Sequence, residues 1–266
     1  MRTFVRQFPT ILKAKKSYGQ HFLNNEHLAE RIAQLLRPEL AYQRVLEVGP
    51  GKGMLTKYLL DQDFRLTVVE ADRDMVNYLQ RHYPALKEDI ISADFLKVPL
   101  DRLFTEPFAL IGNFPYNISS QILFKMLEYR HLIPEMVGMF QLEVAERIIA
   151  PPGNKVYGVI SVLVQAYYEG EMCIEVDRRN FTPPPKVQSG VIRLTRKAET
   201  EIGCDEKLFR RVVKQAFSQR RKMLRNTMKS ILTDQELLAD SFFNQRPEKL
   251  SVADFVQITK WIEERR

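Results

Sequence analysis

Short apolar runs alternate with amphipathic stretches over residues 26–194. The runs are rich in β-branched and aromatic residues, which is typical of buried strands. They lie at Arg44–Val48, Leu66–Glu70, Asp89–Ser92, Phe108–Ile111, Met136–Gln141, Met172–Val176 and Gly190–Leu194. Helical spacing separates them at Glu26–Leu36, Met54–Leu60, Arg73–Arg81, Ser119–Glu128 and Tyr157–Tyr168. This alternation predicts an α/β fold with a mostly parallel seven-stranded sheet covered by helices.

Local signals refine this sheet. Asn25 can cap the first helix, and Pro38 ends it. The Pro-rich loop between the last two strands is too short for a crossover helix. We therefore expect these two strands to form an antiparallel, hairpin-like edge on the sheet.

Beyond Leu194 the strand pattern disappears and helical spacing takes over. The apolar residues that recur at helical intervals are Phe209, Val212, Val213, Ala216, Met223, Leu224, Thr227 and Ile231. The polar stretch Lys197–Glu201 precedes them. We predict a boundary near residue 198, with an α/β domain over residues 1–198 and a small all-helical domain over residues 199–266.

Basic residues are unevenly placed along the 266-residue chain, whose formal net charge is +7. Residues 1–25 hold five Lys or Arg and no acid. Residues 207–233 contain no acid either, and their basic residues are Lys207, Arg210, Arg211, Lys214, Arg220, Arg221, Lys222, Arg225 and Lys229. Solvated surfaces are one explanation, but the pattern favours a polyanionic partner such as nucleic acid, with residues 1–24 forming a basic arm.

The remaining composition argues against a membrane or secreted protein. No apolar run approaches the roughly 18 residues of a membrane span, and Arg6 and Pro9 interrupt the apolar residues near the N-terminus. Cys173 and Cys204 lie in unrelated contexts, so no disulfide framework is indicated. We expect a cytoplasmic protein, with a mitochondrial presequence as the alternative.

A glycine-rich segment, Glu47–Gly53, follows the first strand and opens a helix. Glycines here allow a sharp turn and a close approach of a ligand to the backbone. Gly53 stands where a phosphate-binding loop needs Ser or Thr, and Met54 stands where a dinucleotide fingerprint needs Gly. An S-adenosylmethionine loop fits better, because such loops commonly carry an acid before their glycines, as Glu47 does. A purely structural turn stays open.

Acidic residues follow the next two strands. Glu70 ends the second strand and can accept hydrogen bonds from two ribose hydroxyls. Asp94 and Phe95 follow the third strand and suit the amino group and ring face of adenine. Each acid alone could cap a helix, but their recurrence at successive strand ends favours a cofactor site at this edge.

The fourth strand leads into Asn113-Phe114-Pro115-Tyr116. A polar amide, a rigid proline and an aromatic ring suit a site that hydrogen-bonds the edge of a planar amine and stacks on its face. Asn-x-Pro sequences also form ordinary turns, which is the alternative.

These segments together resemble the KsgA family of ribosomal RNA adenine dimethyltransferases, which have the class I (Rossmann-like) methyltransferase fold. The resemblance covers nearly the whole chain and rests on Lys16–Leu23, Glu47–Gly53, Asn113–Ser120, Phe181–Val187 and Phe217–Asn226. It implies that S-adenosylmethionine donates methyl groups to N6 of two adjacent adenosines in 16S (small-subunit) rRNA, coupled to maturation of the 30S subunit.

The resemblance also implies roles for individual residues. The cofactor contacts would be His21, Leu23, Gly49, Gly51, Glu70, Asp94 and Asn113. Many relatives have Asn in place of His21 and Leu in place of Phe114. The residues expected to bind RNA phosphates are Lys186, Arg220, Arg221, Lys222 and Arg225.

The expected chemistry centres on the target amine. The Asn113 side chain and the Pro115 carbonyl would accept hydrogen bonds from the two N6 protons and direct the lone pair toward the methyl group. Tyr116 would stack on the base. Phe181 would stack on its other face, unless it packs beneath the neighbouring prolines. No metal is expected, because His27, His82 and His131 lack partners at ligand spacing.

Two other functions stay open at this point. One is a large-subunit (23S) rRNA adenine methyltransferase of the macrolide-resistance kind, which would share both pockets; the segment Ser218–Asn226 resembles the small-subunit family more. The other is a ribosome-assembly factor that binds RNA without catalysis. Nothing in the sequence demands a dimer, so we expect a monomer.

Overall fold

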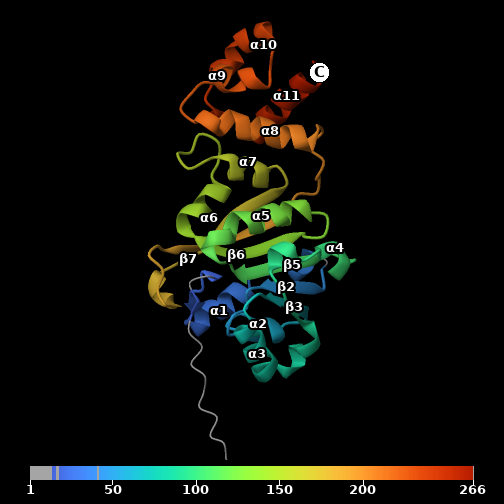
Figure 1. Cartoon of the computed structure of the whole chain (residues 1–266), viewed down its shortest axis with the longest axis vertical. Coiled ribbons are helices and arrows are strands. Elements are labelled where there is room, and N and C mark those ends of the chain that lie inside the picture. Colours follow the sequence, from blue (N-terminus) through green and yellow to red (C-terminus); the bar gives the residue numbers. More distant parts are fainter. Residues whose placement is uncertain (1–13, 16–17, 41, 266) are drawn as a thin grey trace, which may run out of the picture.

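The computed structural model of the chain describes residues 14–15, 18–40 and 42–265 (Figure 1). These residues form a seven-stranded sheet in the order β4-β3-β2-β5-β6-β9-β7. The strands are β2 (Arg44–Val48), β3 (Arg65–Glu70), β4 (Ile90–Ser92), β5 (Phe108–Asn113), β6 (Glu135–Gln141), β7 (Tyr168–Val176) and β9 (Ser189–Arg196). The predicted α/β class and the seven strands are confirmed.

One strand runs against the others. β4, β3, β2, β5 and β6 pair in parallel, whereas β9 pairs antiparallel with both β6 and β7. The predicted antiparallel edge is therefore confirmed. The reversed strand itself lies one place in from the edge strand β7.

Helices cover both faces of the sheet because alternate strand residues point to opposite sides. On one face Val45 and Ala109 pack with α1 (Glu26–Ala33) and α2 (Thr56–Leu60), beside α3 (Arg73–His82). On the other face Leu46 and Leu110 belong to a core shared with the remaining helices of the α/β part. These are α4 (Leu100–Leu103), α5 (Ser119–Glu128), α6 (Leu142–Ile149) and α7 (Val159–Gln165).

Several elements differ from those predicted. The predicted helix over Tyr157–Tyr168 ends at Gln165, and Tyr168 instead starts β7 by pairing with Arg196. Sheet pairing overrides the helical spacing there. The helix α6 was not predicted. A separate two-stranded ladder of β1 (Phe22–Leu23) and β8 (Phe181–Thr182) was not predicted either.

The C-terminal part is helical, as predicted, and no strand follows Arg196 within residues 197–265. Its helices are α8 (Glu206–Ala216), α9 (Leu224–Thr227), α10 (Gln235–Ala239) and α11 (Val252–Glu263). They stack beyond α7, on the side of the sheet that α5 to α7 cover (Figure 1). None of the described helices is long and apolar enough to cross a membrane.

The helical part shares its core with the α/β part. Residue 198 lies in the connection between β9 and α8, but Val162 of α7 and Phe209 of α8 belong to one continuous apolar cluster. The Tyr157 hydroxyl also donates to the Leu250 carbonyl at 2.9 Å. The two parts are therefore packed against each other rather than joined by a free linker.

Candidate active site

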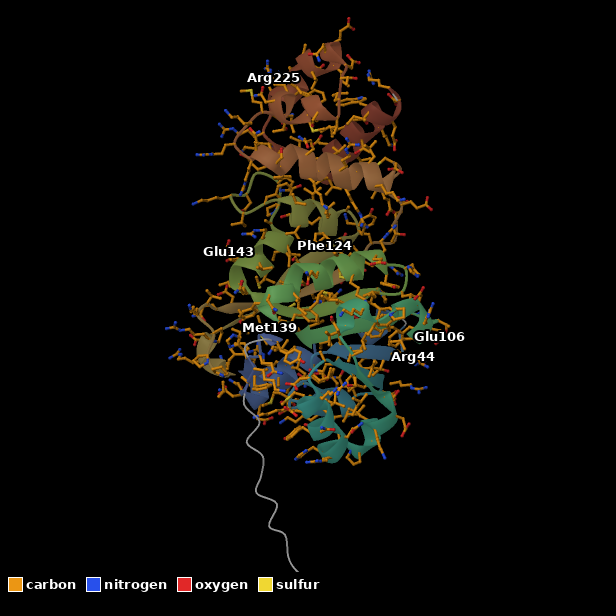
Figure 2. All side chains as sticks on the ribbon, viewed as in Figure 1. Arg44, Glu106, Phe124, Met139, Glu143 and Arg225 are labelled. Atoms are coloured by element: carbon orange, nitrogen blue, oxygen red, sulfur yellow. The ribbon has the colours of Figure 1, made fainter. Side chains whose placement is uncertain are left out.

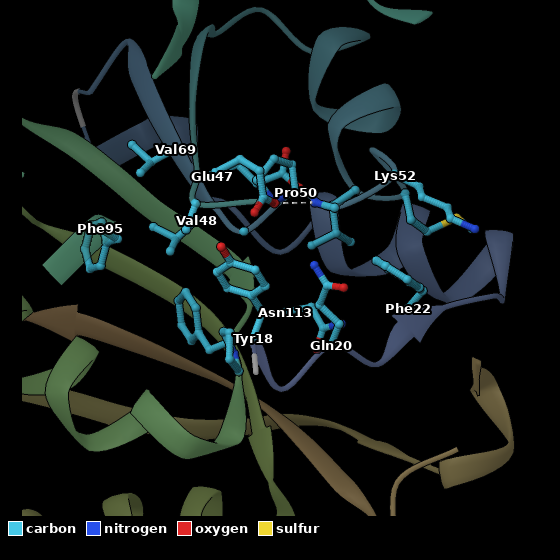
Figure 3. Close-up of a pocket in the computed structure, with 18 of the residues that line it drawn as sticks. Tyr18, Gln20, Phe22, Glu47, Val48, Pro50, Lys52, Val69, Phe95 and Asn113 are labelled. Carbon is cyan, nitrogen blue, oxygen red and sulfur yellow. Dashed lines mark hydrogen bonds between the residues drawn. The ribbon is translucent and has the colours of Figure 1, made fainter. Parts of the chain in front are cut away.

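A cavity of about 690 Å³ opens at the carboxyl ends of β2, β3 and β5, the edge where ligands bind in open α/β sheets (Figure 3). The glycine-rich segment after β2 forms one wall, and residues 18–23 form the wall across from it. The structure brings all the predicted cofactor residues to this cavity: His21, Leu23, Gly49, Gly51, Glu70, Asp94 and Asn113.

The glycine-rich segment leaves its backbone open to the cavity at Gly49. This residue has a φ of 69°, and a Cβ added to it would meet no described atom within 4 Å. Gly49 N–H is fixed to the neighbouring strand by donating to the Val69 carbonyl at 2.9 Å. A ligand can therefore approach the backbone here without meeting a side chain.

Glu47, near the end of β2, holds the start of the helix that follows the glycine-rich segment. Its side chain is 1% exposed and accepts a hydrogen bond from Thr56 Oγ1 at 2.6 Å. Burial raises the pKa of Glu47 to about 8, the Thr56 hydrogen bond opposes the rise, and the charge of nearby Glu70 adds to it. Glu47 thus fastens the end of β2 to the start of α2.

Glu70 is held against the glycine-rich segment by backbone amides. Its Oε2 accepts from Gly51 N at 3.0 Å, and its Oε1 accepts from Asp72 N at 2.8 Å. Burial raises the pKa of Glu70, while these amide bonds act in the opposite direction. Each carboxylate oxygen keeps a lone pair, so the group can also accept from a ligand hydroxyl.

Asp94 both caps a helix and lines the cavity. Its Oδ1 accepts from Leu96 N at 3.0 Å, at the start of the 3-10 turn Phe95–Lys97. The capping alternative is therefore correct for this residue, but it does not remove Asp94 from the cavity wall, where it stands beside Phe95.

Residues 18–23 form the N-terminal strap, which is fastened at both ends. Before it, Lys15 Nζ lies 2.6 Å from Asp72 Oδ1 and 2.7 Å from Asp74 Oδ2. Within it, Gln20 Nε2 donates to Asp72 Oδ2 at 3.1 Å. At its far end β1 pairs with β8. The rest of the predicted basic arm (1–13), with Lys16 and Ser17, lies outside the described residues.

Asn113 projects into the cavity at the end of β5 (Figure 3). Its Nδ2 donates to the His21 carbonyl at 2.9 Å, so the amide presents Oδ1 as its acceptor. Phe114 is buried and packs on Phe140 with ring centroids 5.2 Å apart. The surroundings of Phe114 are therefore apolar and accommodate a phenylalanine at the position where many relatives are expected to have Leu.

The Pro115 carbonyl is less free than expected. It accepts from Ile118 N at 3.2 Å and from Ser119 Oγ at 3.3 Å. Both distances lie at the long end of the range for such bonds. A ligand amine would therefore compete with weak internal partners at this carbonyl.

Tyr116 is fixed at its hydroxyl and along its ring. The hydroxyl lies 2.7 Å from Ser189 Oγ. The ring stacks on His21 with centroids 5.6 Å apart and planes at 27°. Burial raises the pKa of Tyr116 above its ordinary value. The phenol therefore stays protonated near neutral pH.

Phe181 lies away from the cavity. It is 2% exposed and packs in the core beside Leu23 in the β1–β8 ladder. The structure favours the packing alternative for this residue. Stacking of Phe181 on a target base stays a prediction that would require the ladder to rearrange.

The predicted RNA-binding residues lie in two places. Lys186 is exposed in the loop between β8 and β9. The others, Arg220, Arg221, Lys222 and Arg225, are exposed at the helical end of the molecule, where Figure 2 shows Arg225. The Arg220 guanidinium donates to the Lys155 carbonyl.

Three contributors to the site were missed from the sequence. They are Lys15 and Asp72, which fasten the strap, and Ser189, which holds Tyr116. Asp72 follows Glu70 by two residues at the same strand end, which was a usable signal. Ser189 gave none, because its contact depends on the reversed strand β9.

Comparisons with known proteins show related sequences over nearly the whole chain. Residues 11–264 match the family described as ribosomal RNA adenine dimethylase. Ribosomal RNA small subunit methyltransferase A of Bacteroides thetaiotaomicron is 54% identical over 258 residues, covering 96% of each chain. The protein of the same name from Flavobacterium johnsoniae is 52% identical over 253 residues, covering 95% of this chain and 97% of its own.

Solved structures share the fold. A dimethyladenosine transferase from Plasmodium falciparum superposes with a TM-score of 0.76 at 23% identity, over 92% of this chain and 98% of its own. The 23S rRNA methyltransferase ErmE superposes with a TM-score of 0.65 at 27% identity, over 89% and 99%. The fold and cavity define a class I methyltransferase. The chain belongs to the family of ribosomal RNA adenine dimethylases, and the resemblance stated from the sequence is confirmed.

Proposed function

We propose that the protein uses S-adenosylmethionine to dimethylate N6 of two adjacent adenosines in small-subunit rRNA, within immature 30S particles. The observation that carries this proposal is the meeting of the predicted cofactor residues and the segment Asn113–Tyr116 at one cavity. The names of the relatives support the small subunit over the large one.

The cavity residues suit S-adenosylmethionine, which when bound supplies an electrophilic methyl group on a sulfonium. Glu70 would hold the ribose hydroxyls, and Asp94 with Phe95 would hold the adenine amine and ring. The open backbone at Gly49 leaves room for the amino-acid part of the cofactor. The fixed carboxylate of Glu70 supports this assignment, because its two amide bonds orient it before any ligand arrives.

Asn113 would activate the target amine. Since its Nδ2 is committed to the His21 carbonyl, Oδ1 can accept from one N6 proton. The Pro115 carbonyl would accept from the other. These bonds would direct the nitrogen lone pair toward the methyl carbon, and the proton displaced on methylation would leave to water. Alignment of the reacting atoms would supply much of the remaining acceleration.

Tyr116 would hold the target adenine after the base has left its stacked position in the RNA. The neutral phenol ring of Tyr116 would stabilise the transition state by about 0.5–2 kcal/mol through a cation–π interaction, as positive charge develops on the target nitrogen. Lys186 and the basic residues at the helical end would hold phosphates and position the RNA.

We further propose that the protein acts as a cytoplasmic monomer and without a metal ion. The described residues of a single chain supply the lining of the cavity, which supports a site that is complete in one copy. The target positions would be set by the ribosomal particle rather than by a second copy of the chain.

The substitution Asn113→Ala tests the catalytic assignment. We expect it to lower methyl transfer by at least about 100-fold, as loss of a hydrogen bond at a reacting centre does, with the thermal unfolding temperature little changed. The assay incubates the protein with labelled S-adenosylmethionine and unmethylated 30S or 50S particles and maps the label. Asn244→Ala, at an exposed position of the helical end, is the control.

The outcomes test both the role of Asn113 and the function of the protein. Near-normal turnover in the Asn113 variant would contradict the catalytic role proposed for this residue. Label on 50S particles would favour the large-subunit alternative, and no label on either particle from the unaltered protein would leave the RNA-binding factor.

A further inference from the structure

We propose that His21 is a positioning residue that ties the target-base loop, residues 183–188, to the catalytic segment Asn113–Tyr116. This inference rests on the proposed function, from which the loop takes its name. It concerns the order of the loop before RNA arrives, which can be measured without any reaction.

His21 contacts three separate parts of the site. Its backbone carbonyl accepts from Asn113 Nδ2 at 2.9 Å. Its imidazole Nδ1 lies 2.8 Å from the Pro183 carbonyl, to which the Nδ1–H donates. Its ring stacks on Tyr116 at 5.6 Å between centroids. Any residue could supply the carbonyl contact, whereas the other two belong to the side chain.

The target-base loop needs such a tie because its tip is exposed. Lys186 and Val187 project into solvent, Val187 with 44% of its surface exposed. The loop is anchored at its end, where the Gln188 carbonyl accepts from Leu142 N at 2.9 Å. At its beginning, Thr182 pairs with Phe22 in the β1–β8 ladder, and the His21 bond extends this anchor by one residue, to Pro183. A loop ordered in advance loses less conformational entropy when the target base docks.

The histidine side chain combines two contacts that substitutions can separate. His21→Phe keeps a ring for Tyr116 and removes the donor. His21→Asn keeps a donor, since the Asn Nδ2 is attached to the same carbon position as the His Nδ1, and removes the ring. His21→Ala removes both. The pairs wild type/Phe and Asn/Ala therefore each report the donor alone, so a folding defect in one variant leaves the other pair informative.

The first experiment measures tryptic cleavage after Lys186 in the free protein, without RNA or cofactor. We expect cleavage about 3–10-fold faster in the Phe and Ala variants than in the wild type and the Asn variant. His82→Phe is the matched control, because His82 makes the same kinds of contact with Tyr78, a 2.8 Å bond from Nδ1 to its carbonyl and a ring stack. Equal cleavage in all four proteins would overturn the inference.

The second experiment measures methylation of unmethylated 30S particles at saturating S-adenosylmethionine, so that an effect of His21 on cofactor affinity does not enter the rate. We expect kcat/KM for the particles to fall about 3–10-fold in the Phe variant relative to the wild type and the Asn variant. A kcat/KM that stays at the wild-type value under these conditions would show that His21 acts on the cofactor alone, against the inference. Wild-type protein that methylates neither 30S nor 50S particles would refute the proposed function. The cleavage rates would still test whether His21 orders the target-base loop.

Discussion

Glu47 and Glu70 end neighbouring strands, yet the two carboxyl groups are held by different partners. Glu70 is surrounded by backbone N–H donors, which favour its charged form. Glu47 has one hydroxyl partner, on Thr56, and almost no exposed surface. Burial raises the pKa of both carboxyl groups, but at Glu47 only the Thr56 hydroxyl opposes the rise, so Glu47 is neutral near neutral pH.

This difference predicts a pH dependence of stability. The pKa of Glu47 is about 8 in the folded protein and about 4.3 in an unfolded chain, so the folded state binds the proton more tightly. The stabilisation is complete below the lower value and is lost as the pH rises through the higher one. Glu47→Gln should reduce the pH dependence of the unfolding free energy between these two pKa values. At pH 9 the variant should be more stable than the wild type by at least about 1 kcal/mol.

Urea unfolding from pH 5 to pH 9 measures this effect. Glu106→Gln, an exposed change of the same chemistry, should retain the wild-type pH dependence. Parallel curves for the Glu47 variant and the wild type would contradict the assignment of a neutral, buried Glu47.

At the scale of elements, the N-terminal strap forms one wall of the cavity and depends on Lys15 for its first attachment. The partner, Asp72, is 1% exposed, caps α3 and donates its N–H to Glu70. Holding the strap is therefore linked to the geometry of the proposed ribose site. Bonds with Asp72 and Asp74 raise the pKa of Lys15, so this attachment stays charged across the physiological range.

Lys15→Ala should loosen the strap and weaken cofactor binding. We expect the Kd for S-adenosylmethionine to rise about 3–10-fold at low salt, because the cavity loses a fixed wall. The difference from wild type should shrink at 1 M salt, where a surface ion pair is screened. Calorimetric titration measures both values, with Lys87→Ala, at an exposed lysine, as the control. A Kd unchanged at low salt would show that the strap holds without Lys15.

The elements that the sequence could predict are those with a repeating pattern. Alternating or continuous apolar residues located each strand of the large sheet, and Asn25 was correctly assigned as a cap, since it accepts from Leu28 N at 3.0 Å. The β1–β8 ladder has two residues in each strand, far apart in the chain, so no period can reveal it. α6 follows β6 directly, without a turn residue or a side-chain cap at Gln141 to mark the change.

At the scale of the whole molecule, one continuous apolar core connects the α/β part, which holds the cavity, with the basic helical end. The apolar core runs from the sheet through α7 into α8 and α11. Composition could locate the basic block in the sequence, but not its position relative to the cavity, because that position depends on how α8 packs on α7. The structure places Arg225 at the far helical end (Figure 2).

Neutralising part of this basic end should change the salt dependence of RNA binding. In the triple variant Arg220→Ala, Arg221→Ala, Arg225→Ala, we expect weaker binding to 30S particles and a slope of log K against log salt reduced by about 2–3, since each phosphate contact contributes about 0.7–0.9. Binding measured between 50 and 200 mM salt tests this.

A second triple variant provides the control. Arg81→Ala, Lys87→Ala, Arg102→Ala removes the same charge from exposed positions of the α/β part, and we expect it to leave the slope close to that of the wild type. An unchanged slope in the first triple variant would indicate that the helical end meets protein or solvent instead.

The β1–β8 ladder has a consequence for exchanging parts between relatives. Phe22 pairs with Thr182 and Leu23 with Phe181, so the N-terminal strap that lines the cavity and the segment leading into the target-base loop are two halves of one hydrogen-bonded unit. A chimera that receives a foreign target-base loop alone would join mismatched halves. Redesign of RNA specificity in this scaffold therefore requires residues 18–25 and 180–188 to be transplanted as a pair.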